Sequence, residues 1–174
     1  MNSLMIRETE SQDIAQVLAL YPQAFPEEEV KPVVSALLEK VQDIVSLAGF
    51  EGDVLVAHIL FTICGTEERD RRGALLAPLG VIPSLQGQGI GTSLVRAGLE
   101  HLERMGIRQV FVLGDPAYYH RFGFSPEQQV LAPYPISEEW ADAWQSMPLA
   151  VQEPLAAGRL LLPKPWMDPV LWGP

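Results

Sequence analysis

The sequence has only one cysteine, Cys64, among its 174 residues. A single cysteine excludes both an intrachain disulfide framework and a cysteine zinc cluster, and it is expected to pack as a small hydrophobic residue. No apolar run approaches the roughly 20 residues that cross a bilayer. Charged residues precede any apolar run near the start, so no signal peptide is expected either. These absences predict a cytoplasmic protein with no membrane partner.

Basic residues are also scarce: 12 Lys and Arg face 22 Asp and Glu, for a net charge of −10. An acidic chain repels phosphates, which argues against a nucleic-acid partner. Solubility is the simplest reason for this charge, although a cationic partner is also compatible with it. The length suits one domain, which can bury about 70% of its unfolded surface. We therefore expect a single domain over residues 1–174.

Hydrophobic periodicity and turn residues predict the element order β-α-α-β-β-β-α-β-α-β-β. Helices are expected over 11–25 and 27–41, with Pro22 and Pro26 breaking the first. A hairpin is expected to turn at Glu51-Gly52-Asp53. This order predicts an α/β (α+β) fold with a mixed, mostly antiparallel sheet of six or seven strands and helices on both faces.

The proline-rich portion 125–174 holds nine of the 15 prolines. Strands are expected at 129–134 and 157–163, with helical turns over 137–147. This portion is expected to complete the sheet and to be a candidate for one side of an acceptor cleft. Four tryptophans fall here and are expected to form a small separate core or to line that cleft: Trp140, Trp144, Trp166 and Trp172.

Glycines cluster at "SLQGQGIGTS", between an expected strand and an expected helix that ends near Met105. The chain has no Gly-Lys pair, so a P-loop is excluded. A G-x-G-x-x-G fingerprint fails because Thr92 or Leu94 stands at its third glycine position. The stretch matches Q/R-x-x-G-x-G/A instead. Such a loop can place an anion on the unpaired amides and partial positive charge of a helix start.

This stretch and two neighbouring segments resemble the GNAT superfamily of acyl-CoA-dependent N-acyltransferases. "LGVIP", residues 79–83, is similar to the end of the family's fourth strand. Pro78 and Pro83 lack the amides that an unbroken ladder needs. "DPAYYHRFGF", residues 115–124, is similar to the segment after the fifth strand, although Asp115 replaces the usual Asn. The resemblance covers residues 3–125 in element order.

The resemblance implies that acetyl-CoA is the cosubstrate, that no metal is needed, and that the acceptor is an unidentified amine. It also implies that the backbone amide of Val81 stabilises the oxyanion and that Tyr119 protonates the leaving thiolate. A homodimer is allowed. The expected cofactor-binding residues are Leu79, Gly80, Val81, Gln86, Gly87, Gln88, Gly89, Ile90, Gly91 and Thr92.

Three points stay open on the sequence. The base could be any of Glu27, Glu28, Glu29 and Asp53. His58 could be a base in the cleft or, more simply, a structural histidine. The protein could also be a non-catalytic acyl-CoA sensor or interaction module, or an enzyme that transfers a longer acyl group.

Overall fold

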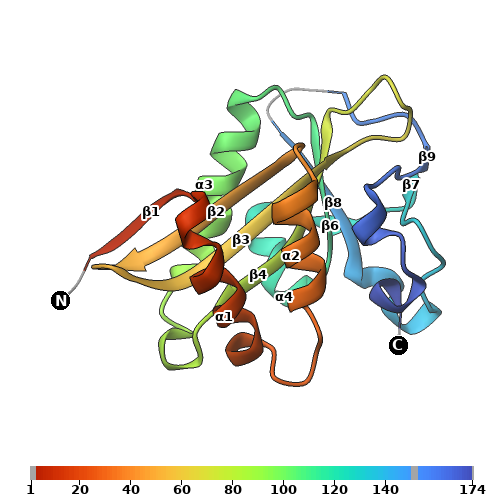
Figure 1. The fold of residues 1–174 in the computed structure, drawn as a ribbon. Helices are drawn as coiled ribbons and strands as arrows, with labels where there is room; N and C mark the ends of the chain where they lie inside the picture. The colour runs from red at the N-terminus through yellow and green to blue at the C-terminus, as the bar shows by residue number, and fades with distance from the viewer. Residues whose placement is uncertain (1–2, 150–152, 174) are drawn as a thin grey trace. The chain divides into compact units, whose positions relative to one another are not determined.

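A computed structural model describes residues 3–149 and 153–173. Its main sheet is mixed, with seven strands in the order β1-β2-β3-β4-β5-β8-β6 (Figure 1). This sheet and its helices confirm the predicted fold class. By its internal contacts the chain forms two compact units, Met1–Phe61 with Ala77–Glu100, and Thr62–Leu76 with His101–Pro174.

The first unit contains the N-terminal strands, the longer helices and the glycine stretch. Its strands are β1 (Leu4–Glu8), β2 (Ile44–Glu51), most of β3 (Val54–Cys64) and the end of β4 (Gly73–Val81). Its helices are η1 (Ser11–Asp13), α1 (Ile14–Ala24), α2 (Lys31–Lys40), η2 (Pro83–Leu85) and most of α3 (Ile90–Arg104). β1 pairs antiparallel with β2, with Met5 opposite Phe50. Gly52 makes the predicted turn after β2, with a φ of 62°.

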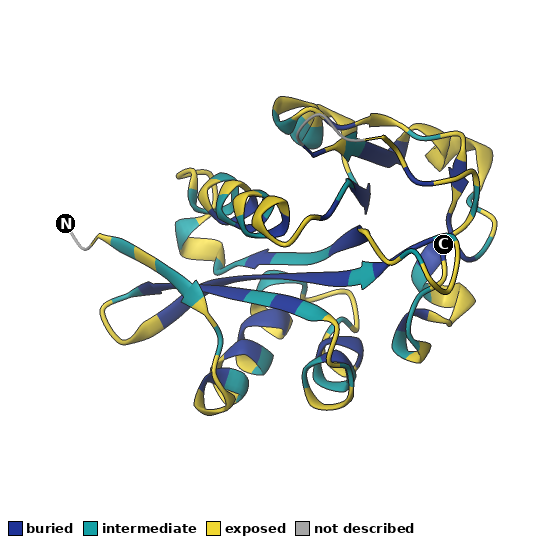
Figure 2. Ribbon diagram, turned by 90° about the horizontal axis from the view of Figure 1, so that it is seen from above, coloured by how far each residue is buried: buried dark blue, intermediate teal, exposed yellow. Residues whose placement is uncertain are grey.

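Two contacts of β3 show that α1 and α3 lie on opposite faces of this strand. Tyr21 of α1 reaches His58, whereas Gly98 of α3 lies against Phe61, where an added Cβ would come within 2.3 Å of the ring. His58 and Phe61 are three residues apart, so they point to opposite faces of the strand. Figure 2 shows the buried sides of these helices turned toward the strands.

The prediction that Pro22 breaks the first helix is wrong, because α1 continues through it to Ala24 and ends just before Pro26. Val17, Leu20 and Tyr21 are buried on one side of this helix. Packing of that face outweighs the loss of one backbone hydrogen bond at proline, a common override of local preference.

The second unit is built around β5 (Gln109–Leu113). β5 runs parallel to β4, with Leu75 opposite Phe111, and antiparallel to β8. The remaining elements are α4 (Pro116–Tyr119), η3 (His120–Phe122), β6 (Ser125–Pro126), β7 (Val130–Leu131), η4 (Glu138–Ala143), β8 (Trp144–Pro148), β9 (Gly158–Arg159), η5 (Lys164–Trp166) and η6 (Pro169–Trp172).

The C-terminal portion departs from the prediction in two ways. Residues 144–147, expected to be helical, lie in β8 because Trp144 stacks on Phe111 of β5 at 5.7 Å between ring centroids. The strands expected at 129–134 and 157–163 shrink to β7 and β9, which pair parallel in a separate small sheet.

Three of the four tryptophans form a buried cluster: Trp144, Trp166 and Trp172. The indole N–H of Trp166 donates to Thr62 Oγ1 at 3.0 Å, and that of Trp172 donates to the Trp166 carbonyl at 2.8 Å. This cluster matches the separate small core of the sequence analysis. Trp140 is different, because it is 48% exposed.

Across the described ranges, 3–149 and 153–173, no helix combines the length and the apolar character that a membrane crossing requires.

Candidate functional site

The glycine stretch leads from β4 into α3 through the short helix η2. The side-chain amide of Gln86 donates to the Val81 carbonyl at 3.0 Å, which ties the loop back to the end of β4. The backbone amide of Leu85 donates to the Ile82 carbonyl, also at 3.0 Å. Local hydrogen bonds therefore hold this loop before any ligand arrives.

Gly87 and Gly89 adopt conformations that other residues avoid, with φ of 77° and 86°. An added Cβ at either position would meet no atom within 4 Å. The glycines are therefore required by backbone conformation and not by internal packing. Both are exposed, so the backbone here faces open space.

The helix α3 begins directly after this loop, at Ile90. Its first internal bond runs from the Ser93 amide to the Gly89 carbonyl at 3.0 Å. The amides of Ile90 and Gly91 come earlier in the turn and have no acceptor within the helix. Leu94 and Val95 are fully buried and anchor this end of the helix. The result is a fixed helix start with amide donors and a partial positive charge, which suits an anion.

The end of β4 lies beside α1. An added Cβ on Gly80 would stand 3.0 Å from Cε1 of Tyr21 and 3.5 Å from Ala24, so Gly80 allows a close approach of that helix. Beyond the strand, the Ile82 amide donates to the Val56 carbonyl at 2.9 Å. The strand itself ends at Val81.

Tyr119 lies in the second unit, at the end of α4. Asp115 caps this short helix by accepting from the Ala117 amide at 2.9 Å. The Tyr119 ring packs against Gly114, where an added Cβ would come within 2.5 Å of it, and against Phe124. Burial raises the pKa of Tyr119, with smaller contributions from Tyr118 and Asp115. The hydroxyl therefore stays protonated at neutral pH, and it makes no hydrogen bond to any described residue.

Tyr118 has a different environment. The Arg121 guanidinium lies 4.4 Å from the centroid of its ring, and Arg121 Nε donates to the Tyr118 carbonyl at 2.9 Å. The two tyrosine rings meet edge to face at 5.0 Å. Replacing each hydroxyl in turn therefore gives a matched pair of variants.

His58 is a structural histidine, as the simpler interpretation of the sequence holds. It is fully buried, with Tyr21 Oη 2.6 Å from Nδ1 and Ser46 Oγ 2.7 Å from Nε2. Burial lowers its pKa from 6.5 to about 3. Both ring nitrogens are occupied, so His58 cannot take a proton from a substrate.

The remaining candidates for a base are all exposed: Glu27, Glu28, Glu29 and Asp53. The described residues contain no group of three or more His, Cys, Asp or Glu side chains able to hold a metal ion. The partners of His58 could not be recognised from the sequence, because Tyr21 is 37 residues away from it and lies in another element.

The chain is similar to acetyltransferases along most of its length. Residues 14–124 match the model of the Acetyltransferase (GNAT) family. An uncharacterized N-acetyltransferase of Escherichia coli K12, YjhQ, is 38% identical over 161 residues, which cover 87% of this chain and 88% of that protein. A second uncharacterized N-acetyltransferase of the same organism, YhbS, is 39% identical over 74 residues, 42% of this chain and 44% of that protein.

Two solved structures have the same fold. The crystal structure of Escherichia coli YhbS in complex with CoA superposes with a TM-score of 0.85 at 24% identity, over 97% of this chain and 94% of that one. A GNAT family acetyltransferase from Brucella melitensis, in complex with acetyl-CoA, superposes with a TM-score of 0.76 at 25% identity, over 95% of this chain and 99% of that one.

Proposed function

Because the chain belongs to the GNAT acetyltransferase family, we propose that it transfers an acetyl group from acetyl-CoA to a primary amine, with Tyr119 as the proton donor to the departing thiolate. The observation that supports cofactor binding best is the exposed glycine loop at the start of α3. Two relatives of the same fold were crystallised with CoA or acetyl-CoA.

The pyrophosphate of acetyl-CoA binds at the glycine loop in this proposal. A negative diphosphate approaches the backbone at Gly87 and Gly89 because no side chain stands there, and the first-turn amides of α3 donate to its oxygens. The residues that hold it are those from Gln86 to Thr92. The helix is rigidly anchored, so the donors are already in position before binding.

The pantetheine arm extends along the last residues of β4. A ligand chain that runs beside a strand uses the same amide and carbonyl groups as a paired strand would. β4 ends at Val81, whose carbonyl accepts from Gln86 of the glycine loop. This supports the assignment of Leu79, Gly80 and Val81 to cofactor binding.

The reaction is a direct transfer. The amine nitrogen attacks the thioester carbonyl carbon, and the Val81 amide donates to the oxygen that gains negative charge. The C–S bond then breaks, and the electron pair leaves on sulfur. Tyr119 gives its proton to that sulfur, which its neutral and unshared hydroxyl supports.

An amine that arrives protonated first gives one proton to a carboxylate, directly or through water, because only the neutral nitrogen has the electron pair that attacks. The extra proton that the nitrogen carries after attack is then lost through water and restores the Tyr119 hydroxyl. Glu27, Glu28, Glu29 and Asp53 are exposed carboxylates of the first unit and are the candidates. Because the net charge of −10 attracts cations, a positively charged amine is the expected class of acceptor.

The test is release of free CoA thiol from acetyl-CoA in the presence of a panel of amines. The panel should contain polyamines, aminoglycosides, amino acids and peptides with free N-termini, with alcohols as controls. Amine-dependent thiol release supports the proposal. Tight CoA binding in calorimetry without thiol release from any amine would favour a non-catalytic acyl-CoA-binding protein.

A further inference from the structure

Tyr21 connects the interior of the first unit to the end of β4. Its side chain is fully buried on α1, and Cε1 of its ring lies 3.0 Å from the place where a Cβ on Gly80 would stand. Real Cβ atoms rarely have contacts this short, so a side chain at position 80 would have little room. The Tyr21 ring therefore packs directly on the Gly80 backbone. A shift of Tyr21 would therefore change the support of β4 next to Val81.

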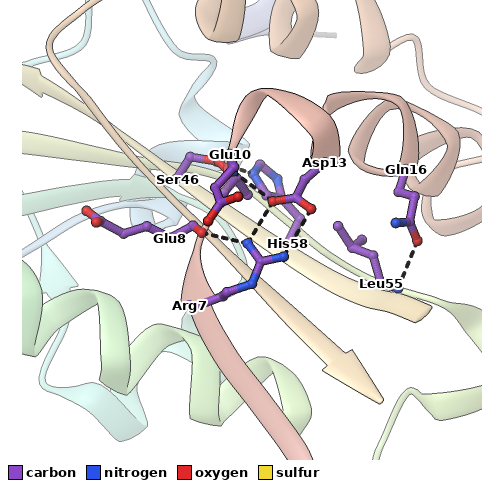
Figure 3. A network of polar contacts seen from close by, with 9 residues as sticks. Arg7, Glu8, Glu10, Asp13, Gln16, Ser46, Leu55 and His58 are labelled. Atoms are coloured by element: carbon purple, nitrogen blue, oxygen red, sulfur yellow. Dashed lines mark hydrogen bonds and ion pairs between the residues drawn. The ribbon is translucent and has the colours of Figure 1, made fainter. Parts of the chain in front are cut away.

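A chain of hydrogen bonds fixes the other end of the Tyr21 ring. Tyr21 Oη lies 2.6 Å from His58 Nδ1, and His58 Nε2 lies 2.7 Å from Ser46 Oγ. Ser46 Oγ in turn accepts from Thr9 Oγ1 at 2.7 Å. Figure 3 shows Ser46 and His58 behind the ion pair of Arg7 with Asp13. This series of hydrogen bonds thus runs from Thr9, just after β1, through Ser46 of β2 and His58 of β3 to Tyr21 of α1.

The hydrogen positions follow from the partners available. Tyr21 Oη has Nδ1 as its hydrogen-bond partner, so a donating Nδ1 would leave the buried hydroxyl hydrogen without an acceptor. Tyr21 therefore donates to Nδ1, and Nε2 of the neutral imidazole carries the proton and donates to Ser46. Every bond in the chain then has a fixed direction, which holds the tyrosine ring more tightly than apolar packing alone.

Hydrogen bonds also hold Val81 and Ile82, the two residues that follow Gly80. Gln86 donates to the Val81 carbonyl at 3.0 Å, and the Ile82 amide donates to the Val56 carbonyl at 2.9 Å. Gly80 has no side chain, so its position depends on the ring packed against it. A rigid Tyr21 thus completes the support of the segment 80–82 within the first unit.

We propose that Tyr21, held by His58 and Ser46, is a positioning residue that sets the place of the Gly80–Val81 backbone. This inference rests on the proposed function in one respect, the role of the Val81 amide at the thioester oxygen. Tyr21 touches neither substrate nor cofactor in this arrangement. Its hydroxyl should affect kcat more than capture of CoA, because the pyrophosphate contacts of the proposed site lie in the glycine loop and not at Gly80 and Val81.

The first test compares Tyr21→Phe with Thr9→Val, a matched control that removes a hydroxyl from the far end of the same chain. Tyr21→Phe should lower kcat by roughly tenfold or more, because a misplacement of about 1 Å can cost 10²-fold. The KM for acetyl-CoA should rise by a smaller factor than that by which kcat falls, because only the pantetheine contacts at Gly80 and Val81 are disturbed and the glycine loop is not. Thr9→Val loosens the hydrogen-bond chain only at its far end and leaves the bonds of His58 to Ser46 and Tyr21 in place, so it should lower kcat much less than Tyr21→Phe does.

Amide hydrogen exchange gives a readout that needs no turnover. Tyr21→Phe should speed exchange at Gly80 and Val81 several-fold or more, while amides of β5 keep their wild-type rates. A wild-type protein that neither binds CoA nor releases thiol would refute the proposed function, and the exchange rates would still decide the inference about Gly80 and Val81.

A second variant separates positioning from stability. Tyr21→Phe leaves His58 Nδ1 buried without a partner, whereas Tyr21→Phe with His58→Leu removes both groups and should recover much of the lost stability. Under the positioning account, kcat stays low in the double variant. Recovery of kcat together with stability, or wild-type kcat and exchange rates in Tyr21→Phe, would overturn the proposal.

Discussion

The buried histidine makes a quantitative prediction about acid stability. His58 has a pKa of about 3 in the folded protein, because burial disfavours the imidazolium, against 6.5 in the unfolded chain. Below pH 6.5 the unfolded chain binds a proton that the folded protein does not. Above pH 6.5 the titration of His58 therefore leaves the free energy of unfolding unchanged. From pH 6.5 down toward pH 3 it lowers that free energy progressively.

The size of the effect follows from the two pKa values. Between pH 7 and pH 5 the single proton difference lowers the free energy of unfolding by about 2 kcal/mol. Asp13 also contributes to acid sensitivity, because its hydrogen bonds and ion pair with Arg7 lower its pKa. That contribution is lost below the ordinary carboxyl range near pH 4, so it does not overlap the window from pH 7 to pH 5.

The assay is urea unfolding of the wild type and of His58→Gln at pH 7, 6 and 5. Glutamine can still hydrogen-bond in the core but does not titrate. The stability difference between wild type and variant should therefore shrink by about 2 kcal/mol from pH 7 to pH 5. A difference that stays constant over this range would show that His58 titrates normally in the folded protein and that its burial has been misjudged.

Two further substitutions test the glycines. Gly89→Asp should weaken CoA binding more than tenfold in calorimetry, because it brings a negative charge to the proposed pyrophosphate site. Gly106→Asp is the control: Gly106 has a similar φ of 84° but lies after α3, so this variant should bind CoA like the wild type. Equal affinity of the two variants for CoA would contradict the proposed site. Gly98→Ala should lower the free energy of unfolding by about 1–3 kcal/mol, because its Cβ would lie 2.3 Å from the Phe61 ring; thermal melts measure this, and an unchanged midpoint would show that Phe61 moves freely.

The sequence predicted the parts of this fold that depend on local patterns. The hairpin turn at Gly52 and the loop from Gln86 to Gly91 depend on glycine conformations that can be recognised from neighbouring residues. Trp144 was assigned to a helix because its place is decided by β5, more than thirty residues earlier.

The interior of the candidate site could not be predicted for the same physical reason. His58 looks like any histidine in an apolar strand, and its state depends on Tyr21 and Ser46, which come from other elements. Hydrophobic periodicity identifies Tyr21 as buried but does not show what its hydroxyl meets. Likewise, only the structure shows that Tyr119 packs on Gly114 and that Tyr118 lies under Arg121.

The central claim is that Tyr119 protonates the leaving thiolate, and Tyr119→Phe tests it most directly. The substitution removes one hydroxyl and almost no volume from a packed ring. We expect kcat for thiol release to fall by about 10²-fold, as for loss of a general acid, with CoA affinity unchanged. Tyr118→Phe is the matched control and should remain close to the wild type. Turnover of Tyr119→Phe within twofold of the wild type, or a larger loss in Tyr118→Phe, would contradict the account.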